Sequence, residues 1–211
     1  MSDIKHFRTD YGKQELNRKN LPTNPIVLFK RWLADAMASV PKDANAFVLS
    51  SVALDGSPHS RVLLLREVLE GGFIFFTNYN SQKGQEMDAN PAVSMNLFWP
   101  ELERQVRING VVEKVSAEKS DVYFASRPYE SKVGAWASEQ SSAIDSRMTL
   151  EERYVLFSEK YTEEVPRPSH WGGYLIKPTT MEFWQGRSSR LHDRFRFTLA
   201  DEQWTVDRLA P

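Results

Sequence analysis

The segment from Phe183 to Arg194 contains the residue types best suited to act on a small anionic substrate. If residues 190–195 are extended, the two-residue period of a strand predicts that Arg190, His192 and Arg194 lie on one face. A guanidinium group is a planar fork that suits phosphate or carboxylate, and an imidazole can donate, accept or move a proton near neutral pH. The competing interpretation is that these charges form the solvated face of an edge strand.

A second group of polar side chains, at the ends of predicted strands, indicates a cofactor that carries phosphate. Charge-assisted hydrogen bonds to phosphate contribute about 1.5–3 kcal/mol each, so a cluster of suitable donors is informative. The chain has no GxGxxG or Walker A motif, and a nucleotide would therefore be held in another way. The alternative is that strand ends are polar in most proteins. The group consists of Arg61, Arg66, Thr77, Ser81 and Lys83.

A third group lies at the end of a predicted helix. Tyr123 and Arg127 are four residues apart and would share a helical face, and Ser131 follows just after the break at Pro128. A phenol, a guanidinium and a hydroxyl can converge on one anion. A helix C-terminus stabilised by a nearby arginine explains the same pattern equally well.

Two further side chains are suited to a flat heteroaromatic ring. Gln105 alternates with the apolar Val106 and Ile108, so its amide is expected on the other face of the strand, where it can read a donor and an acceptor on a ring edge. Trp184 comes just before the basic residues, which makes it a candidate wall for the ring. An ordinary exposed glutamine and a core tryptophan are the alternatives.

Composition excludes several classes of protein and of binding site. A formal net charge of -1 over 211 residues gives no basic excess, so we do not expect binding to nucleic acid. The absence of cysteine excludes disulfides and thiolate chemistry. His6, His59 and His170 have no partner at metal-ligand spacing, so no metal site is expected. Because the sequence shows neither a membrane-spanning run nor a signal-peptide core, we expect a cytoplasmic protein that does not enter a membrane.

The elements that must position these side chains are mostly short strands. A helix is predicted over residues 25–40, with Asn24 as its cap and Pro41 as its stop. A hairpin with Asp55–Gly56 at its turn follows, and then come FIFFTN, AVSMNLFW and RQVRINGVVEKV, with Asn109–Gly110 as a turn or a bulge. Such a series of short strands with few helices between them suggests an antiparallel barrel.

The second half of the chain adds helices and more strands. Short helices are predicted over residues 81–90, 116–126 and 131–137, and a longer one begins at a capping box formed by Thr149 and Glu152. Four further strands are expected at GGYLIK, MEFW, RFRFTL and QWTVDRL. The predicted class is therefore α+β, mainly β with flanking helices. Residues 25–211 are expected to form a single domain, and residues 1–24 a mobile N-terminal arm.

Taken together, the motifs resemble one family, the pyridoxine (pyridoxamine) 5′-phosphate oxidases. The resemblance extends over nearly the whole chain, through RVLLLR, FFTN, ERQVRI, YFASRP, SKVGAWASEQSS, WGGY, EFWQG, RLHDR and DRLAP. It implies an antiparallel split β-barrel that binds FMN, with the FMN at the interface of a homodimer. It also implies that pyridoxine 5′-phosphate and pyridoxamine 5′-phosphate are oxidised by O2 to pyridoxal 5′-phosphate, with release of hydrogen peroxide.

The resemblance also assigns roles to individual residues. FMN contacts are implied for Arg61, Arg66, Phe76, Thr77, Lys83, Gln105, Gln140, Ser141, Trp184 and Arg194, those of Phe76 through its backbone. Substrate contacts are implied for Arg8 and Tyr11 in an arm that closes over the site, and for Arg66, Tyr123, Arg127, Ser131, Arg190 and His192. Arg190 and His192 would be the catalytic pair, with the roles of charge stabiliser and proton acceptor not divided between them.

Two positions depart from the family pattern. Arg66 stands where a lysine is usual, and Gln82 stands where an arginine usually precedes Lys83. Arginine keeps the charge but not the point-like geometry of lysine, and the neutral Gln82 removes one positive charge. Two other classes remain open from the sequence: a non-catalytic split-barrel protein that binds FMN or pyridoxal phosphate, and a flavin reductase that uses a nicotinamide donor.

Overall fold

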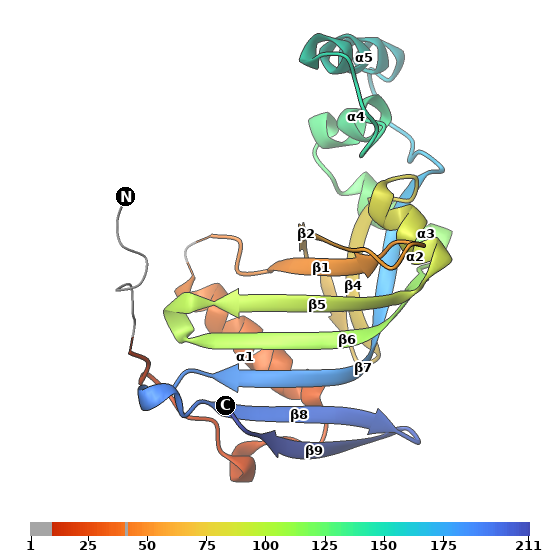
Figure 1. The fold of residues 1–211 in the computed structure, drawn as a ribbon. Coiled ribbons are helices and arrows are strands. Elements are labelled where there is room, and N and C mark those ends of the chain that lie inside the picture. Colours follow the sequence, from red (N-terminus) through yellow and green to blue (C-terminus); the bar gives the residue numbers. More distant parts are fainter. Residues whose placement is uncertain (1–9, 41) are drawn as a thin grey trace.

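One antiparallel sheet dominates the protein, as Figure 1 shows. The computed structural model describes residues 10–40 and 42–211. The sheet has nine strands within these residues: seven follow the order β2-β1-β5-β6-β7-β4-β3, and β8 and β9 continue the sheet beside β7. The strands are β1 (Ala46–Val52), β2 (Pro58–Leu64), β3 (Glu67–Leu69), β4 (Gly72–Asn78), β5 (Ala92–Trp99), β6 (Arg104–Lys114), β7 (Trp171–Gln185), β8 (Asp193–Ala200) and β9 (Gln203–Leu209). The predicted α+β class with a mainly β core is confirmed.

The long strand β7 connects the two ends of this sheet. Its first half pairs with β4 and its second half with β8, while β6 runs along its other edge. The sequence predicted two separate strands here, and that prediction is wrong because a bulge carries β7 past Pro178. The register of β6 against β7 shifts between Asn109 and Gly110. Of the turn and the bulge that the sequence allowed at these residues, the bulge is therefore confirmed. A Cβ at Gly110 would lie 2.1 Å from the carbonyl oxygen of Lys177, so only glycine fits there.

A single helix, α1 (Pro25–Ser39), covers one face of the sheet (Figure 1). The Asn24 side chain caps it by accepting the Ile26 N–H at 2.9 Å, as predicted. The predicted stop at Pro41 lies outside the described residues. Phe29 and Trp32 on the buried face of α1 make edge-to-face contacts with Phe73 and Phe183 of the sheet. This apolar burial is the main force that holds α1 to the sheet.

The other helices flank one end of the sheet. They are α2 (Gln82–Ala89), α3 (Ala117–Ala125), α4 (Tyr129–Ala137) and α5 (Arg147–Lys160). Ser81 and Ser116 cap α2 and α3, at the starts of two of the predicted helices. For α5 the predicted Thr149 capping box is wrong: Ser146 accepts the Thr149 N–H at 3.2 Å, and the helix begins at Arg147. Figure 1 shows α4 and α5 together beyond the end of the sheet.

Candidate functional site

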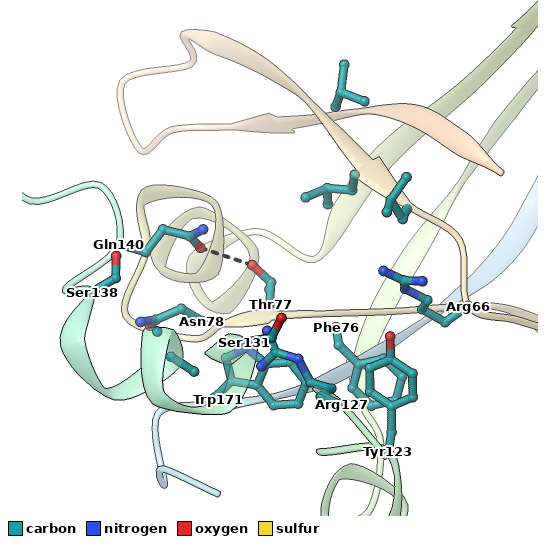
Figure 2. Close-up of a pocket in the computed structure, with 15 residues that line it drawn as sticks. Arg66, Phe76, Thr77, Asn78, Tyr123, Arg127, Ser131, Ser138, Gln140 and Trp171 are labelled. Atoms are coloured by element: carbon teal, nitrogen blue, oxygen red, sulfur yellow. Dashed lines mark hydrogen bonds between the residues drawn. The ribbon is translucent and has the colours of Figure 1, made fainter. Parts of the chain in front are cut away.

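A pocket of about 510 Å³ lies between β2, the end of β4 and helix α4 (Figure 2). It brings together side chains that are far apart in the sequence. The predicted residues that line it are Arg66, Phe76, Thr77, Tyr123, Arg127, Ser131 and Gln140. Tyr123 and Arg127 do not share a helical face as expected, because α3 ends at Ala125 and Arg127 follows it. They still line one pocket with Ser131, since α4 begins just after Pro128.

Stacked aromatic rings form one wall of this pocket. The Phe76 and Tyr123 rings are 3.9 Å apart with an interplanar angle of 13°, and the Trp171 ring lies 5.6 Å from Phe76 at 10°. The guanidinium carbon of Arg127 lies 4.6 Å from the centre of the Trp171 ring. One terminal nitrogen of Arg127, NH1, is buried and has no hydrogen-bond partner among the described residues. Burial also lowers the pKa of Arg127. A buried donor without a partner is costly, so this nitrogen is suited to an anion.

A second cation lies behind the pocket on α2. Lys83 is only 5% exposed, and its Nζ donates to Ser81 Oγ and to Gln140 Oε1, each at 3.0 Å. Thr77 Oγ1 donates to the same Gln140 oxygen at 3.3 Å. Burial, together with the nearby charge of Arg61, lowers the pKa of Lys83 to about 8. The charge of Glu86 acts in the opposite direction but does not cancel this effect. An anion next to the ammonium group would favour its charged form.

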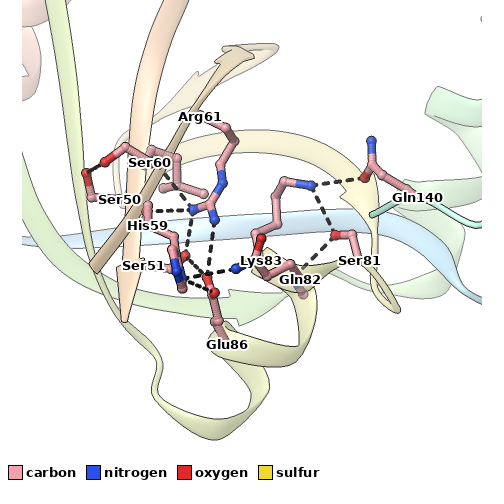
Figure 3. A network of polar contacts seen from close by, with 12 residues as sticks. Ser50, Ser51, His59, Ser60, Arg61, Ser81, Gln82, Lys83, Glu86 and Gln140 are labelled. Atoms are coloured by element: carbon pink, nitrogen blue, oxygen red, sulfur yellow. Dashed lines mark hydrogen bonds and ion pairs between the residues drawn. The ribbon is translucent and has the colours of Figure 1, made fainter. Parts of the chain in front are cut away.

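Arg61 belongs to a polar network that also contains an acidic residue (Figure 3). Its guanidinium donates to Ser51 Oγ at 2.6 Å and to the buried carboxylate of Glu86 at 3.2 Å. His59 Nδ1 lies 2.6 Å from the other Glu86 oxygen and 3.1 Å from the Gln82 amide. Burial raises the pKa of Glu86, but hydrogen bonds from Ser51, His59 and Arg61 outweigh that effect and lower it. This network fixes the orientation of Arg61.

The other predicted site residues gather at the far end of β7. Trp184 packs against His192, with ring centres 4.7 Å apart, and Tyr11 meets the Trp184 ring edge-on at 5.6 Å. The backbone N–H of Arg187 donates to His192 Nδ1 at 3.1 Å, which assigns the proton of the neutral ring to Nε2. Burial lowers the pKa of His192, and the charges of Arg190 and Arg194 lower it further. The neutral imidazole is thus arranged to donate a hydrogen bond from Nε2.

Residues 190–195 are not all extended, so the condition for placing Arg190, His192 and Arg194 on one strand face is not met. Residues Ser188–Arg190 form a 3-10 turn, and Ser189 and Arg190 have left-handed φ angles of 54° and 61°. Strand β8 begins only at Asp193, so Arg190 does not alternate with His192 along one strand face. Left-handed backbone is uncommon for residues other than glycine, and two in succession indicate a constrained turn. This turn holds the Arg190 side chain in an exposed position beside His192.

Arg194 and Gln105 lie next to Trp184 on the sheet. Both are paired with Trp184 in the strand register, Gln105 from β6 and Arg194 from β8. The Gln105 amide donates to Asn96 Oδ1 at 2.7 Å, on the face opposite Val106 as predicted. Arg194 donates from Nε to Glu182 at 2.9 Å and from NH1 to the Ala210 carbonyl at 2.7 Å.

The predicted site residues therefore form two groups at opposite ends of β7. The 15 residues of this strand span about 50 Å along their path at 3.3 Å per residue. We call the group around Arg127 and Lys83 the pocket half-site and the group around Trp184 and His192 the strand half-site. Ser141 is exposed with φ of 75° and does not line the pocket, and Arg8 lies outside the described residues.

Sequence reasoning missed several residues of both groups. Trp171 and Asn78 line the pocket but were not selected as site residues. Both stand in motifs that carry the resemblance, WGGY and FFTN. Glu86 and Glu182 orient the arginines, and nothing in their local sequence distinguishes them from surface acids. In the part of the chain that the structure describes, no group of three or more His, Asp or Glu side chains could hold a metal ion. Nor does any described helix combine the length and apolar character needed to cross a bilayer.

Comparison with solved structures supports the fold. PhzG from Burkholderia lata 383, solved in complex with tetrahydrophenazine-1-carboxylic acid, superimposes with a TM-score of 0.90 at 29% identity, over 95% of this chain and 99% of that one. A pyridoxamine 5′-phosphate oxidase-related, FMN-binding protein from Nostoc punctiforme gives a TM-score of 0.70 at 16% identity, over 94% and 100% of the two chains. The chain thus has the split-barrel fold of these proteins, which confirms the predicted architecture.

Comparison with known protein sequences identifies the family. The pyridoxine/pyridoxamine 5′-phosphate oxidase of Haemophilus ducreyi is 50% identical over 99% of this chain and 100% of its own length. The enzyme of the same name from Burkholderia multivorans is 50% identical over the full length of both chains. Residues 33–158 match the pyridoxamine 5′-phosphate oxidase family, and residues 171–211 match its C-terminal dimerisation region. The chain therefore belongs to the pyridoxamine 5′-phosphate oxidase family.

Proposed function

We propose that the protein is an FMN-dependent oxidase that converts pyridoxine 5′-phosphate and pyridoxamine 5′-phosphate to pyridoxal 5′-phosphate, with O2 as the electron acceptor. One observation carries the proposal beyond family membership. The pocket contains a buried guanidinium nitrogen of Arg127 that has no partner in the part of the chain that the structure describes, next to the Tyr123 and Ser131 hydroxyls and the stacked aromatic wall. A phosphate group would satisfy that nitrogen, because its oxygens are strong acceptors that suit a guanidinium fork.

The same pocket half-site fits the phosphate of FMN. Lys83 and Arg61 supply two positive charges, and Thr77 and Gln140 supply polar groups on the pocket side. Glu86 holds the Arg61 guanidinium in place through a 3.2 Å hydrogen bond. The remaining FMN contacts expected from the sequence, at Gln105, Trp184 and Arg194, belong to the strand half-site. Gln82, which stands where the family usually has an arginine, is hydrogen-bonded to His59 and does not line the pocket.

We infer a homodimer in which each active site combines the two half-sites of different chains. The two groups lie at opposite ends of β7, so one small substrate cannot touch both within one chain. The match of residues 171–211 to a dimerisation region supports this assembly, since that region contains Trp184, Arg190, His192 and Arg194. FMN would then lie at the interface, between the pocket of one subunit and the Trp184 ring of its partner.

FMN, when bound, would supply the hydride-accepting chemistry of this oxidation and the reduction of O2 to hydrogen peroxide. The residues of this chain bind and orient the substrate. Arg127, Tyr123 and Ser131 would hold its phosphate, and Arg190 would stabilise negative charge that develops on the substrate oxygen. Because His192 accepts the Arg187 N–H at Nδ1, its Nε2–H would donate to the substrate and orient the pyridine ring. This arrangement favours the orienting role over that of a proton acceptor.

The direct test is anaerobic mixing of the FMN-loaded protein with pyridoxine 5′-phosphate, and separately with pyridoxamine 5′-phosphate, while the visible absorbance of the flavin is followed. We expect bleaching, and recovery of the colour with pyridoxal 5′-phosphate formed when air is admitted. A flavin that stays oxidised with both substrates would favour a non-catalytic binding protein, and bleaching by NADH alone would favour a flavin reductase. A cytoplasmic location stays a prediction from the sequence.

A further inference from the structure

A buried acidic residue, Glu103, lies at the strand half-site without a role in the proposed chemistry. It is 5% exposed, lies in a tight turn just before β6 and has a left-handed φ of 54°. Its backbone oxygen accepts the Gly186 N–H at 2.7 Å and the Gln185 amide at 3.2 Å, which joins β6 to the end of β7. The backbone of Glu103 therefore stabilises the fold, and these contacts leave its carboxylate free to bind another segment.

The Glu103 carboxylate binds the N-terminal segment. One oxygen, Oε2, accepts the backbone N–H of Gly12 at 2.8 Å and that of Lys13 at 3.0 Å. The neighbouring Arg104 donates to the side-chain oxygen of Gln14. A buried carboxylate that accepts two backbone N–H groups forms charge-assisted hydrogen bonds, which are stronger than neutral ones. This one side chain thus fixes the direction of the backbone at residues 12–13.

The fixed direction places Tyr11 against the strand half-site. The Tyr11 ring lies 5.6 Å from that of Trp184 and 5.9 Å from that of His192, both edge-on. The approach is close enough that a Cβ at Gly186 would lie 2.8 Å from Tyr11 Cβ and Cγ. Glycine at 186 and the carboxylate of Glu103 therefore act together: one makes room for the tyrosine, and the other holds the backbone that carries it.

The segment is anchored again on the other side of these residues. Leu16 is buried, and its N–H donates to Asp193 Oδ2 at 3.1 Å, at the start of β8. The Asp193 carboxylate also accepts from Arg187 and Arg208. The Asp193 anchor keeps residue 16 in place, but four residues separate it from Tyr11. Lys13 Nζ donates to the Glu101 carbonyl at 2.7 Å, but this contact holds a side chain. The Glu103 carboxylate binds the backbone N–H groups of the two residues that follow Tyr11.

We propose that Glu103 is a positioning residue for substrate binding: its carboxylate holds Gly12 and Lys13 so that Tyr11 closes the substrate side of the site beside His192. The inference rests on the proposed function for the identity of the ligand, a phosphorylated pyridine. Tyr11 is the residue that contacts the ligand, and Glu103 acts through it. Loss of the Glu103 contacts would leave the flavin site and the fold in place but would weaken the hold on the ligand.

The experiment compares two substitutions at Gly12, which is exposed. Gly12→Pro removes the N–H donor, whereas Gly12→Ala keeps it, and a Cβ at this position meets nothing within 4 Å. With the FMN-loaded protein, we expect KM for pyridoxamine 5′-phosphate to be about tenfold higher in the proline variant than in the alanine reference, the effect of one hydrogen bond to a charged group. The values of kcat should differ by less than about twofold, since binding is lost equally in the ground and transition states.

Substitution of the acid itself gives the reciprocal test. Glu103→Ala should raise KM about tenfold or more, and Glu103→Gln should have a smaller effect because its amide oxygen can still accept. Amide hydrogen exchange over residues 10–16 should quicken in the same order, with Glu101→Gln, an exposed acid in the same turn, as the control. A merely structural role would instead lower kcat and the FMN content together.

The outcome can be separated from that of the proposed function. The dissociation constant of pyridoxal 5′-phosphate, measured by equilibrium titration of the same variants, needs no turnover and should rise in parallel with KM. If the wild-type protein oxidises neither substrate, the proposed function fails, while exchange and titration still decide the role of Glu103. Equal KM and dissociation constants for Gly12→Pro and Gly12→Ala, or unchanged exchange in Glu103→Ala, would overturn the inference.

Discussion

The division of the site between the two ends of β7 predicts how mixed dimers behave. Arg127→Met damages the pocket half-site, and Arg190→Met damages the strand half-site. Each loses one charge-assisted bond to the substrate, worth about 1.5–3 kcal/mol, so each homodimer should lose about one to two orders of magnitude in kcat/KM. In a heterodimer of the two variants, one active site receives both substitutions and the other receives neither.

Such heterodimers can be isolated with two different affinity tags and assayed for pyridoxal 5′-phosphate formation. We expect about half of the wild-type activity, because one of the two sites of a two-fold dimer is intact. The reciprocal heterodimer pairs wild-type chain with a chain that carries both substitutions. There every site contains one defect, and activity should fall to the level of the single-variant homodimers.

The two heterodimers together make the test decisive. If each site were built within one chain, the expected activities of the two heterodimers would be reversed. The first heterodimer would be nearly inactive, and the second would keep about half of the activity. That outcome would refute the argument from the length of β7. Size-exclusion chromatography of each preparation should show the dimer, so that loss of assembly is not mistaken for loss of a site.

Three further predictions concern single residues. Arg190→Met in a homodimer should lower kcat/KM by about one to two orders of magnitude, and a change under about twofold in steady-state assays would remove Arg190 from the site. Trp184→Ala should release FMN more readily in equilibrium dialysis, and an unaltered FMN affinity would assign Trp184 to the core. Because Lys83 has a pKa of about 8 in the free protein and bound phosphate favours its charged form, FMN affinity should be constant below that pH and fall above it, by up to about tenfold per unit. Fluorescence titration should show this slope in the wild type and lose it in Lys83→Met, and an equal slope in both would contradict the assignment.

Much of the fold could be predicted from the sequence because its signals are local. The caps at Asn24 and Ser116 and the Asp55–Gly56 turn depend on neighbouring residues only, and the structure confirms them. The start of α5 was predicted wrongly because Ser146 and Thr149 are both good caps, and the sequence does not show which one the chain uses. The continuity of β7 depends on a register shift against β6 that leaves Thr179 without a paired residue in β6, and the local pattern of β7 does not reveal this shift.

The candidate site, like the fold, could be predicted from the sequence only in part. Arg127 and Lys83 could be selected from residue type and from the resemblance, and the structure adds that Lys83 and the NH1 atom of the half-buried Arg127 are buried. The left-handed turn at Ser189 and Arg190 was missed, since alternation of arginine and histidine looks the same in a strand and in a turn. Glu86 and Glu103 were missed because an acid that orients a neighbour is recognised only once its partner is in place.

The buried cations of the pocket half-site have a consequence for the life of the protein in the cell. Before the cofactor binds, the chain keeps Lys83 and the Arg127 nitrogen NH1 desolvated, which costs stability. A ligand that binds only the folded state adds stability as its concentration rises above its dissociation constant. Newly made protein should therefore resist proteolysis better when flavin is abundant, and its steady-state amount should follow the supply of the vitamin from which FMN is made.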